Sequence, residues 1–161
     1  MMDTAQIRRA SAGDAMAIST IWNEIIRDTI ATFTSAEKAP AVLASLMQDQ
    51  PFWVAEDAGR VLGFATYAQF RGGPGYAHTM EHTVHLAPQS QRQGVGRALM
   101  AHLEEAARTD GVHSLMAGIS GENSAGLAFH RALGYLEAAR LPQVGYKFGR
   151  WHDLVLMQKF L

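Results

Sequence analysis

Apolar and polar side chains recur with two different periods in this chain, and the two periods separate predicted helices from predicted strands. Apolar residues recur every three or four positions over residues 14–29, which predicts an amphipathic helix. Ser11 stands three residues before Asp14, a spacing that predicts a capping box at the start of this helix. A similar pattern predicts a second helix over residues 36–47, whose inner face would carry Val42, Leu43, Leu46 and Met47.

Alternation with a period of two predicts the strands of the first half of the chain. Residues 7–10 form a short first strand, and residues 52–56 and 61–70 form two more that are joined by a turn. A glycine-rich loop follows, and the strand pattern resumes at Tyr76. Beyond it, one strand face carries Met80, His82, Val84 and Leu86, and the other carries Glu81, Thr83 and His85.

The second half of the chain alternates between strand and helix patterns. A helix is predicted from the glycine pair Gly94 and Gly96 to about residue 109, then a strand at 115–120 and a helix at 124–133. Two last strands are predicted, at 136–141 and 151–159. The order β-α-α-β-β-β-α-β-α-β-β predicts a single α/β domain over residues 1–161, built on a mixed sheet.

Composition indicates which binding partners and which cellular compartment to expect. The 161 residues carry a formal net charge of −1, which gives no electrostatic reason to expect nucleic acid or an anionic membrane as partner. The chain has no cysteine, so disulfides, cysteine-bound metals and an acyl-cysteine intermediate are excluded. No basic and apolar leader begins the sequence, and no stretch approaches the roughly 20 apolar residues that span a bilayer. We therefore expect a cytoplasmic protein.

The segment between the fourth strand and the following helix is a candidate anion site. Glycine lets the backbone approach a ligand closely, and free N–H groups at a helix N-terminus favour an anion such as a diphosphate. A tight strand-to-helix turn is the alternative. No Gly-Lys-Ser/Thr follows, as a Walker A loop requires, and Leu99 stands where a dinucleotide fingerprint has a third glycine or alanine. The segment reads Gln91-Arg92-Gln93-Gly94-Val95-Gly96-Arg97.

Several motifs together carry a resemblance to a known family. The pattern Gln91-x-x-Gly94-x-Gly96 is similar to the loop with which GNAT acetyltransferases hold the diphosphate of acetyl-CoA. Residues 123–135 resemble a later GNAT motif in which the asparagine, here Asn123, contacts the cofactor. Residues 79–84 (Thr-Met-Glu-His-Thr-Val) and 144–151 (Val-Gly-Tyr-Lys-Phe-Gly-Arg-Trp) resemble the phosphinothricin and methionine sulfoximine or sulfone N-acetyltransferases.

This resemblance implies the GNAT fold, a mixed central sheet with helices on both faces. It also implies acetyl-CoA as co-substrate, a homodimer, and transfer of an acetyl group to the amino group of a small amino-acid-like molecule. A chain of this size often completes its pocket with a partner copy. The implied cofactor contacts come from Asn123 and from the loop residues Gln91, Arg92, Gln93, Gly94, Val95, Gly96 and Arg97.

The chemistry requires a base, because an ammonium ion must lose a proton before it can attack a thioester. Glu81 lies on the strand face opposite Met80 and matches the glutamate of the family, so we expect it to be the base. A solvated strand carboxylate is the alternative. The resemblance assigns stabilisation of the carbonyl oxygen to backbone N–H groups of Val84, His85 and Leu86, splayed by a local bulge.

An acid for the leaving thiolate is helpful but not required, because such a thiolate has a pKa of about 8.5. His130 stands where many GNAT enzymes have a tyrosine. Two roles are open for it, proton donor or structural hydrogen-bonding group. Since the chain has no cysteine, we expect direct transfer within a ternary complex.

The candidate substrate-binding residues are Arg71, Tyr76 and Phe33, with core packing as the alternative for Phe33. Ala77 stands where relatives often carry an arginine, so Arg71, with Arg150, is the candidate partner for a substrate carboxylate or phosphinate. Phosphinothricin and methionine sulfoximine or sulfone are the candidate substrates. The alternatives are a polyamine, an aminoglycoside or a protein N-terminus as acceptor, and a catalytically silent acyl-CoA-binding module.

Seven histidines raise the question of a metal site. His78 and His82 share a strand face but lie about 13 Å apart at roughly 3.3 Å per residue, and His85 points the other way. Zinc needs ligands at about 2 Å. We therefore expect no metal.

Overall fold

A sheet of seven strands runs through residues 5–161, which are the part of the chain that the computed structural model describes. The strand order is β1-β2-β3-β4-β5-β7-β6, and every neighbouring pair is antiparallel except β4 and β5. The sheet is therefore mixed, as expected. Its strands are β1 (Gln6–Arg9), β2 (Phe52–Asp57), β3 (Arg60–Gln69), β4 (Thr79–Leu86), β5 (Ser114–Ser120), β6 (Leu136–Lys147) and β7 (Arg150–Phe160).

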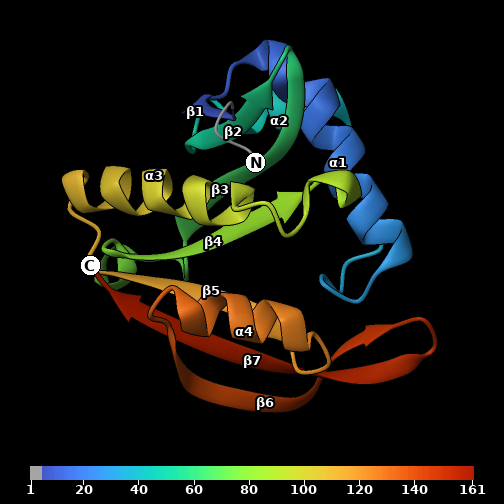
Figure 1. The fold of residues 1–161 in the computed structure, drawn as a ribbon. Helices are drawn as coiled ribbons and strands as arrows, with labels where there is room; N and C mark the ends of the chain where they lie inside the picture. Colours follow the sequence, from blue (N-terminus) through green and yellow to red (C-terminus); the bar gives the residue numbers. More distant parts are fainter. Residues whose placement is uncertain (1–4) are drawn as a thin grey trace.

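Helices cover both faces of this sheet. On one face α1 (Ala15–Asp28) and α2 (Pro40–Leu46) pack over β2 and β3 around the buried side chains of Leu43 and Phe64. On the other face α3 (Val95–Thr109) packs around Leu99 and Leu103, and Figure 1 shows it beside β4, with α4 (Ser124–Ala132) next to β5 and β7. No helix within residues 5–161 has the length and apolar character needed to cross a membrane.

The first helix begins at the capping box that the sequence predicts, whereas the second helix differs from its predicted bounds. Ser11 and Asp14 form the expected capping box, followed by a short 3₁₀ turn and then α1. Helix α2 is shorter than predicted, because Pro40 occupies its first turn and the preceding residues are extended. The predicted inner position of Val42 is wrong. Its side chain is 59% exposed, because this short helix buries only the face of Leu43.

Two strand boundaries also differ from the prediction. Tyr76 lies in a 3₁₀ turn (Pro74–Tyr76), and β4 begins three residues later. Strand β6 continues past Leu141 to Lys147 although Pro142 interrupts the pattern. It does so because β6 is the edge strand, where a missing N–H can face away from the sheet, and its register with β7 shifts between Leu141 and Gly145.

The feature that positions the site is a gap in the sheet between β4 and β5, which we call the fork. These two parallel strands pair only from Thr79 to Glu81 on β4, opposite Ser114 to Met116 on β5. Beyond these residues both strands continue without pairing to one another. The register of β3 with β4 is unbroken from Gly63 to Gln69, so the expected bulge in β4 is wrong. The strands separate instead between β4 and β5, where their pairing stops.

Candidate active site

The loop before α3 presents a row of backbone donors at the open end of the fork. Helix α3 begins at Val95, and its N-cap, Gly94, has a left-handed φ of 82°. Within residues 5–161, none of the six backbone N–H groups from Arg92 to Arg97 has a hydrogen-bond acceptor. Free donors beside the positive end of a helix dipole favour an anion. The loop therefore has the donor set that the diphosphate of acetyl-CoA requires.

The two glycines of this loop are needed for different reasons. A Cβ atom at Gly94 would meet no protein atom, so the space beside it is open, and its positive φ favours glycine. A Cβ atom at Gly96 would lie 3.2 Å from the ring of Phe129 in α4. Gly96 therefore serves the packing of α3 against α4. Arg92 also has a positive φ, of 63°, which is a position that suits glycine.

Asn123 lies at the same end of the fork as the glycine loop. It lies in the turn between β5 and α4 and is the N-cap of α4, where its Oδ1 accepts a hydrogen bond of 2.9 Å from the backbone N–H of Gly126. Because β4 and β5 are parallel, the loops that follow them lie at the same end of the two strands. Asn123 and residues 91–97 thus lie at the same end of these two strands.

Glu81 occupies the last paired position before the fork, opposite Met116. Its side chain leaves the sheet on the face opposite Met80, which packs against the α3 side of the core. The carboxylate lies over Gly118 of β5, where a Cβ atom would be 2.9 Å from Oε2. Burial raises the pKa of Glu81, and no charged neighbour contributes to that shift. An unpaired carboxylate with a raised pKa, in contact with solvent, can accept a proton.

Backbone donors of β4 face the fork at alternate residues. The N–H of Ala87 bonds to the carbonyl of Leu62 on β3 at 2.8 Å, so odd-numbered N–H groups of β4 point toward β3. The N–H groups of Val84 and Leu86 consequently point into the fork. The N–H of His85 points away from it, and its ring lies between Trp22 and Phe64, where burial lowers its pKa to about 4.

His130 is buried on α4, and both of its ring nitrogens have a partner. Nδ1 lies 2.8 Å from the carbonyl oxygen of Gly126, and Nε2 lies 2.9 Å from Nε2 of His82. Burial lowers the pKa of His130 below its usual value, so the ring is neutral at neutral pH. The candidate acid therefore lies in a closed pair with His82.

The three candidate substrate-binding residues do not form one group. Arg71 lies over the ring of Tyr76 at 5.4 Å, in the loop that enters β4. Phe33 stacks on His152 with ring centroids 5.3 Å apart, at the beginning of β7, which is the opposite end of the strands. Arg150 forms a 2.7 Å salt bridge with Glu122, so it is already paired.

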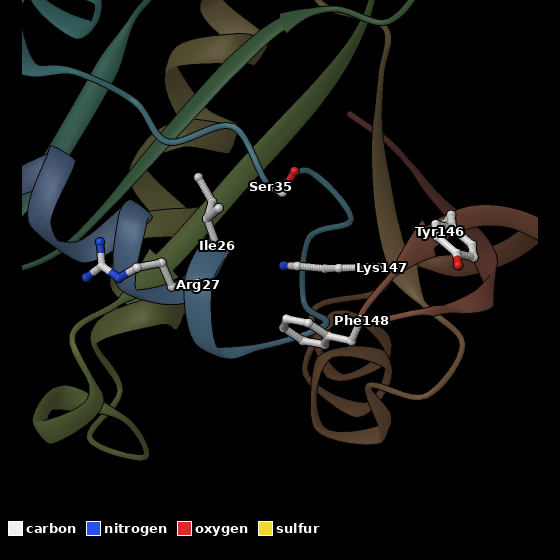
Figure 2. Close-up of a pocket in the computed structure, with 6 residues that line it drawn as sticks. All are labelled: Ile26, Arg27, Ser35, Tyr146, Lys147 and Phe148. Carbon is white, nitrogen blue, oxygen red and sulfur yellow. The ribbon is translucent and has the colours of Figure 1, made fainter.

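A pocket of about 390 Å³ lies between the end of α1 and the turn of the β6–β7 hairpin. Figure 2 shows Lys147 extended from the hairpin toward the loop that carries Ser35. Its Nζ donates to the carbonyl oxygens of Thr29 and Thr32 at 2.6 and 2.8 Å. Lys147 therefore holds the loop that contains Phe33 against the hairpin. The pocket is lined by Ile26, Arg27, Ser35, Tyr146, Lys147 and Phe148.

Three residues of this region were not identified as site residues from the sequence, although two of them carry a signal for their role. His82 is a polar residue on an otherwise apolar strand face, which indicates a buried hydrogen bond. Gly118 is a glycine inside a strand, which indicates the close approach of another group. Lys147 belongs to the subgroup motif, but its partners are backbone carbonyls that no sequence pattern reveals.

No group of three or more histidine, cysteine, aspartate or glutamate side chains is placed to hold a metal ion in the part of the chain that the structure describes. Of the three histidines considered for such a site, His82 is bonded to His130 and His85 lies on the other sheet face. His78 faces the carbonyl of Gly111 at 3.2 Å.

Known proteins resemble this chain in sequence. Residues 19–135 match the acetyltransferase (GNAT) family. The chain is 38% identical to the L-amino acid N-acyltransferase MnaT of Escherichia coli, over 94% of this chain and 91% of that protein. It is 37% identical to the L-methionine sulfoximine/L-methionine sulfone acetyltransferase of Salmonella typhimurium, over 94% of this chain and 92% of that protein.

Solved structures agree. The phosphinothricin acetyltransferase of Sinorhizobium meliloti, solved in complex with AcCoA, superposes with a TM-score of 0.92 at 31% identity, over 98% of this chain and 89% of that chain. The fold of this chain, with its mixed seven-stranded sheet, is thus shared with that acetyltransferase. This protein belongs to the GNAT family of acetyltransferases.

Proposed function

We propose that this protein transfers the acetyl group of acetyl-CoA to the amino group of a small amino-acid-like substrate, by direct attack in a ternary complex. The observation that carries the proposal is the position of Glu81, an unpaired carboxylate with a raised pKa at the base of the fork. The six free N–H groups at the start of α3 lie at the open end of the same fork. Base and anion site thus lie along one gap in the sheet.

The proposed contacts to acetyl-CoA come from residues 91–97 and Asn123. In this proposal the N–H groups from Arg92 to Arg97 bind the diphosphate, and acetyl-CoA supplies an activated acetyl thioester. The N–H groups of Val84 and Leu86 point into the fork and are the donors for the carbonyl oxygen that gains negative charge. The role first expected for the N–H of His85 passes to these two, because that group points toward β3.

Glu81 takes a proton from the substrate ammonium, directly or through one water molecule, so that the neutral amine can attack the thioester carbon. Contact of the carboxylate with solvent gives this proton a route out of the site. No protein nucleophile is needed, because the amine forms the new C–N bond as the C–S bond breaks and the sulfur leaves as a thiolate.

Methionine sulfoximine, methionine sulfone and phosphinothricin are the proposed substrates. Relatives that are named for these compounds match nearly the whole chain. Each compound carries an α-carboxylate beside its amine, and Arg71 is the proposed partner for that carboxylate. The guanidinium of Arg71 lies over Tyr76 and has no carboxylate partner among residues 5–161, so it can bind one from a substrate.

A screen of acceptor amines tests this function. Release of free CoA thiol would be measured with acetyl-CoA and each of these three compounds, common amino acids, spermidine, an aminoglycoside and a peptide with a free N-terminus. We expect turnover with the amino-acid analogues and little with the polycations. Turnover restricted to polyamines or peptides contradicts the proposed substrate class, and tight acetyl-CoA binding without any turnover points to an acyl-CoA-binding module.

We also propose that the chain forms one domain over residues 1–161 and acts in the cytoplasm as a homodimer. Exposed large apolar side chains gather on the last two strands and their turn, and β6 is the unpaired edge of the sheet. A second copy of this chain would cover these side chains, which a lone copy exposes to water. They are Leu136, Leu141, Val144, Tyr146, Phe148, Trp151 and Phe160.

Sedimentation of charge variants tests the homodimer. Tyr146 packs edge-on against Trp151 at 4.9 Å, so Tyr146→Glu should place a charge within the interface and shift the protein toward the 17.6 kDa monomer. Met16→Glu is the matched control, because Met16 is also exposed but lies on α1. A wild-type mass near 17.6 kDa at assay concentration would contradict the proposal.

A further inference from the structure

His82 and His130 form a buried pair that joins β4 to α4. Their Nε2 atoms lie 2.9 Å apart, and the rings are nearly parallel with centroids 5.1 Å apart. Both side chains are less than a tenth exposed. Two imidazoles this close must share one proton between the facing nitrogens, because two lone pairs or two N–H groups would repel each other.

The hydrogen bonds determine where each proton lies. The carbonyl of Gly126 can only accept, so His130 carries its proton on Nδ1 and presents a lone pair at Nε2. His82 must then donate from its own Nε2, which leaves a lone pair on its Nδ1. That atom is buried and has no partner within residues 5–161. His130 consequently has no proton that is free to leave.

The surroundings keep the pair neutral. Burial lowers the pKa of His82 to about 3, and burial also lowers that of His130. The ring of Tyr135 meets both imidazoles edge-on, at 5.4 and 5.3 Å. Beyond that ring, Glu104 accepts from the Tyr135 hydroxyl and forms a 2.7 Å salt bridge with Lys159.

The pair lies at the base of the fork. Glu81 is the last residue of β4 that pairs with β5, and His82 is the next residue along the strand. His130 belongs to the helix that follows β5. The bond between the two histidines therefore joins β4 to α4 at the level where the pairing of β4 with β5 stops, one residue from the proposed base.

We propose that His82 is a positioning residue, which ties β4 to α4 at the base of the fork and locks His130 as a hydrogen-bond acceptor instead of a proton donor. This inference rests on the proposed acetyl transfer. When the C–S bond breaks, the sulfur keeps the electron pair and leaves as a thiolate. It takes its proton from water. The substrate nitrogen loses two protons as it changes from ammonium to amide: the first leaves through Glu81 before attack, and the second, lost once the C–N bond has formed, neutralises the hydroxide that this water leaves.

Nitrogen NMR of the resting protein tests the tautomers without any turnover. In protein labelled with ¹⁵N-histidine, long-range proton–nitrogen spectra distinguish a protonated ring nitrogen from a bare one. We expect His130 to be protonated on Nδ1 and bare on Nε2 from pH 7 to pH 9, and His82 to show the opposite pattern. A proton on Nε2 of His130, or titration of His130 within this range, would overturn the proposal.

Kinetics of paired variants test the role. His82→Gln can still donate near the Nε2 position, whereas His82→Leu cannot and leaves Nε2 of His130 unpaired. We expect His82→Leu to lose about tenfold or more in kcat/KM, and His82→Gln to recover most of that loss. A change at the exposed His102, His102→Gln, is the control for histidine replacement.

The variant His130→Gln shows whether His130 acts as a hydrogen-bond acceptor or as a general acid. Glutamine can accept from His82 but cannot act as a general acid, so we expect most of the activity to remain and the pH–rate profile to keep its shape. A fall of about 10²–10⁴-fold with acetyl-CoA affinity and melting temperature unchanged would show that His130 donates the proton. If wild type acetylates no amine, the proposed function fails, and the NMR test still decides the tautomers.

Discussion

Glu81 is the single residue on which the proposed chemistry depends most directly. Glu81→Gln preserves the shape of the side chain but removes its ability to accept a proton. We expect kcat to fall by about 10²–10⁴-fold at pH 7, while acetyl-CoA affinity stays nearly level. The deficit should shrink as the pH rises toward the pKa of the substrate amine, because solution then supplies the neutral amine. The pH–rate profiles of variant and wild type, from pH 6 to 10, measure this.

Parallel profiles, or near-full activity of Glu81→Gln at pH 7, would show that Glu81 is not the base. A structural glutamate would instead lower the melting temperature without recovery at high pH. The raised pKa of Glu81 also predicts the acid limb of the wild-type profile. Activity should be lost below a pH somewhat above the usual glutamate value, because protonation of the carboxylate removes the base.

Gly118 is the residue that leaves room for this carboxylate. In Gly118→Ala the new methyl group would lie 2.9 Å from Oε2 of Glu81, so the carboxylate must move. Since misplacement of a reacting group by about 1 Å can cost roughly 10²-fold, we expect kcat to fall by about 10- to 100-fold. The melting temperature should change little, because the displaced atoms are the end of a flexible side chain.

Gly72→Ala is the control for that experiment, because a Cβ atom there meets nothing within 4 Å. Steady-state kinetics and thermal melting of both variants would be compared. Equal kcat values for the two variants would show that the position of Glu81 over Gly118 has no part in turnover.

At the scale of secondary-structure elements, the start of α3 offers a test in which binding and stability change in opposite directions. Gln93 is exposed and lies two residues before the helix. A carboxylate in Gln93→Glu would interact favourably with the helix dipole, so the melting temperature should hold or rise. The same charge should repel a bound diphosphate and weaken acetyl-CoA binding by about tenfold. Calorimetry with acetyl-CoA measures the affinity.

Gln48→Glu supplies the same charge at an exposed position that follows α2. If both variants bind acetyl-CoA as tightly as wild type, the anion site is not at α3. Substitution of Gly96 is a poorer test of this site. A side chain there would collide with Phe129 and lower stability whether or not a ligand binds.

The sequence predicts the type and order of the elements better than their ends. The apolar periods of α1 and α3 extend over four turns and leave no ambiguity, so both helices are confirmed. The end of β6 was missed because Pro142 reads as a strand terminator unless the strand is known to be at an edge. Glu81 and the glycine loop were identified by motif. The pairing of His82 with His130 joins residues 48 positions apart, and no local pattern contains it.

At the scale of the whole molecule, neutral histidines inside the fold make the free energy of unfolding depend on pH. His82 and His85 have pKa values of about 3 and 4, well below the value of about 6.5 that they have when unfolded. Between these values the unfolded chain binds more protons, so the free energy of unfolding falls as the pH is lowered. The contribution of each histidine is fully present above pH 6.5 and falls by about 2 kcal/mol between pH 7 and pH 5.

Denaturant unfolding at pH 7, 6 and 5 measures this dependence. His82→Gln removes one of the histidines whose pKa is lowered, so its free energy of unfolding should decline less steeply than that of wild type, by about 2 kcal/mol over the interval. His102→Gln should follow wild type, because His102 is exposed. Identical slopes for wild type and His82→Gln would contradict the burial of a neutral His82. Glu122 does not account for a change in this pH interval, because Arg150 and His152 lower its pKa to about 2.

The bonds from Lys147 to Thr29 and Thr32 join parts of the chain that are 118 and 115 residues apart. A ribosome adds about 5–20 residues per second, so the connection between α1 and α2 emerges roughly 6 to 24 seconds before its anchor is made. Strand β7, which lies between β5 and β6, is also synthesised last of the seven. Premature termination before codon 147 would therefore yield a chain that lacks β7 between β5 and β6 and leaves the segment carrying Phe33 untethered.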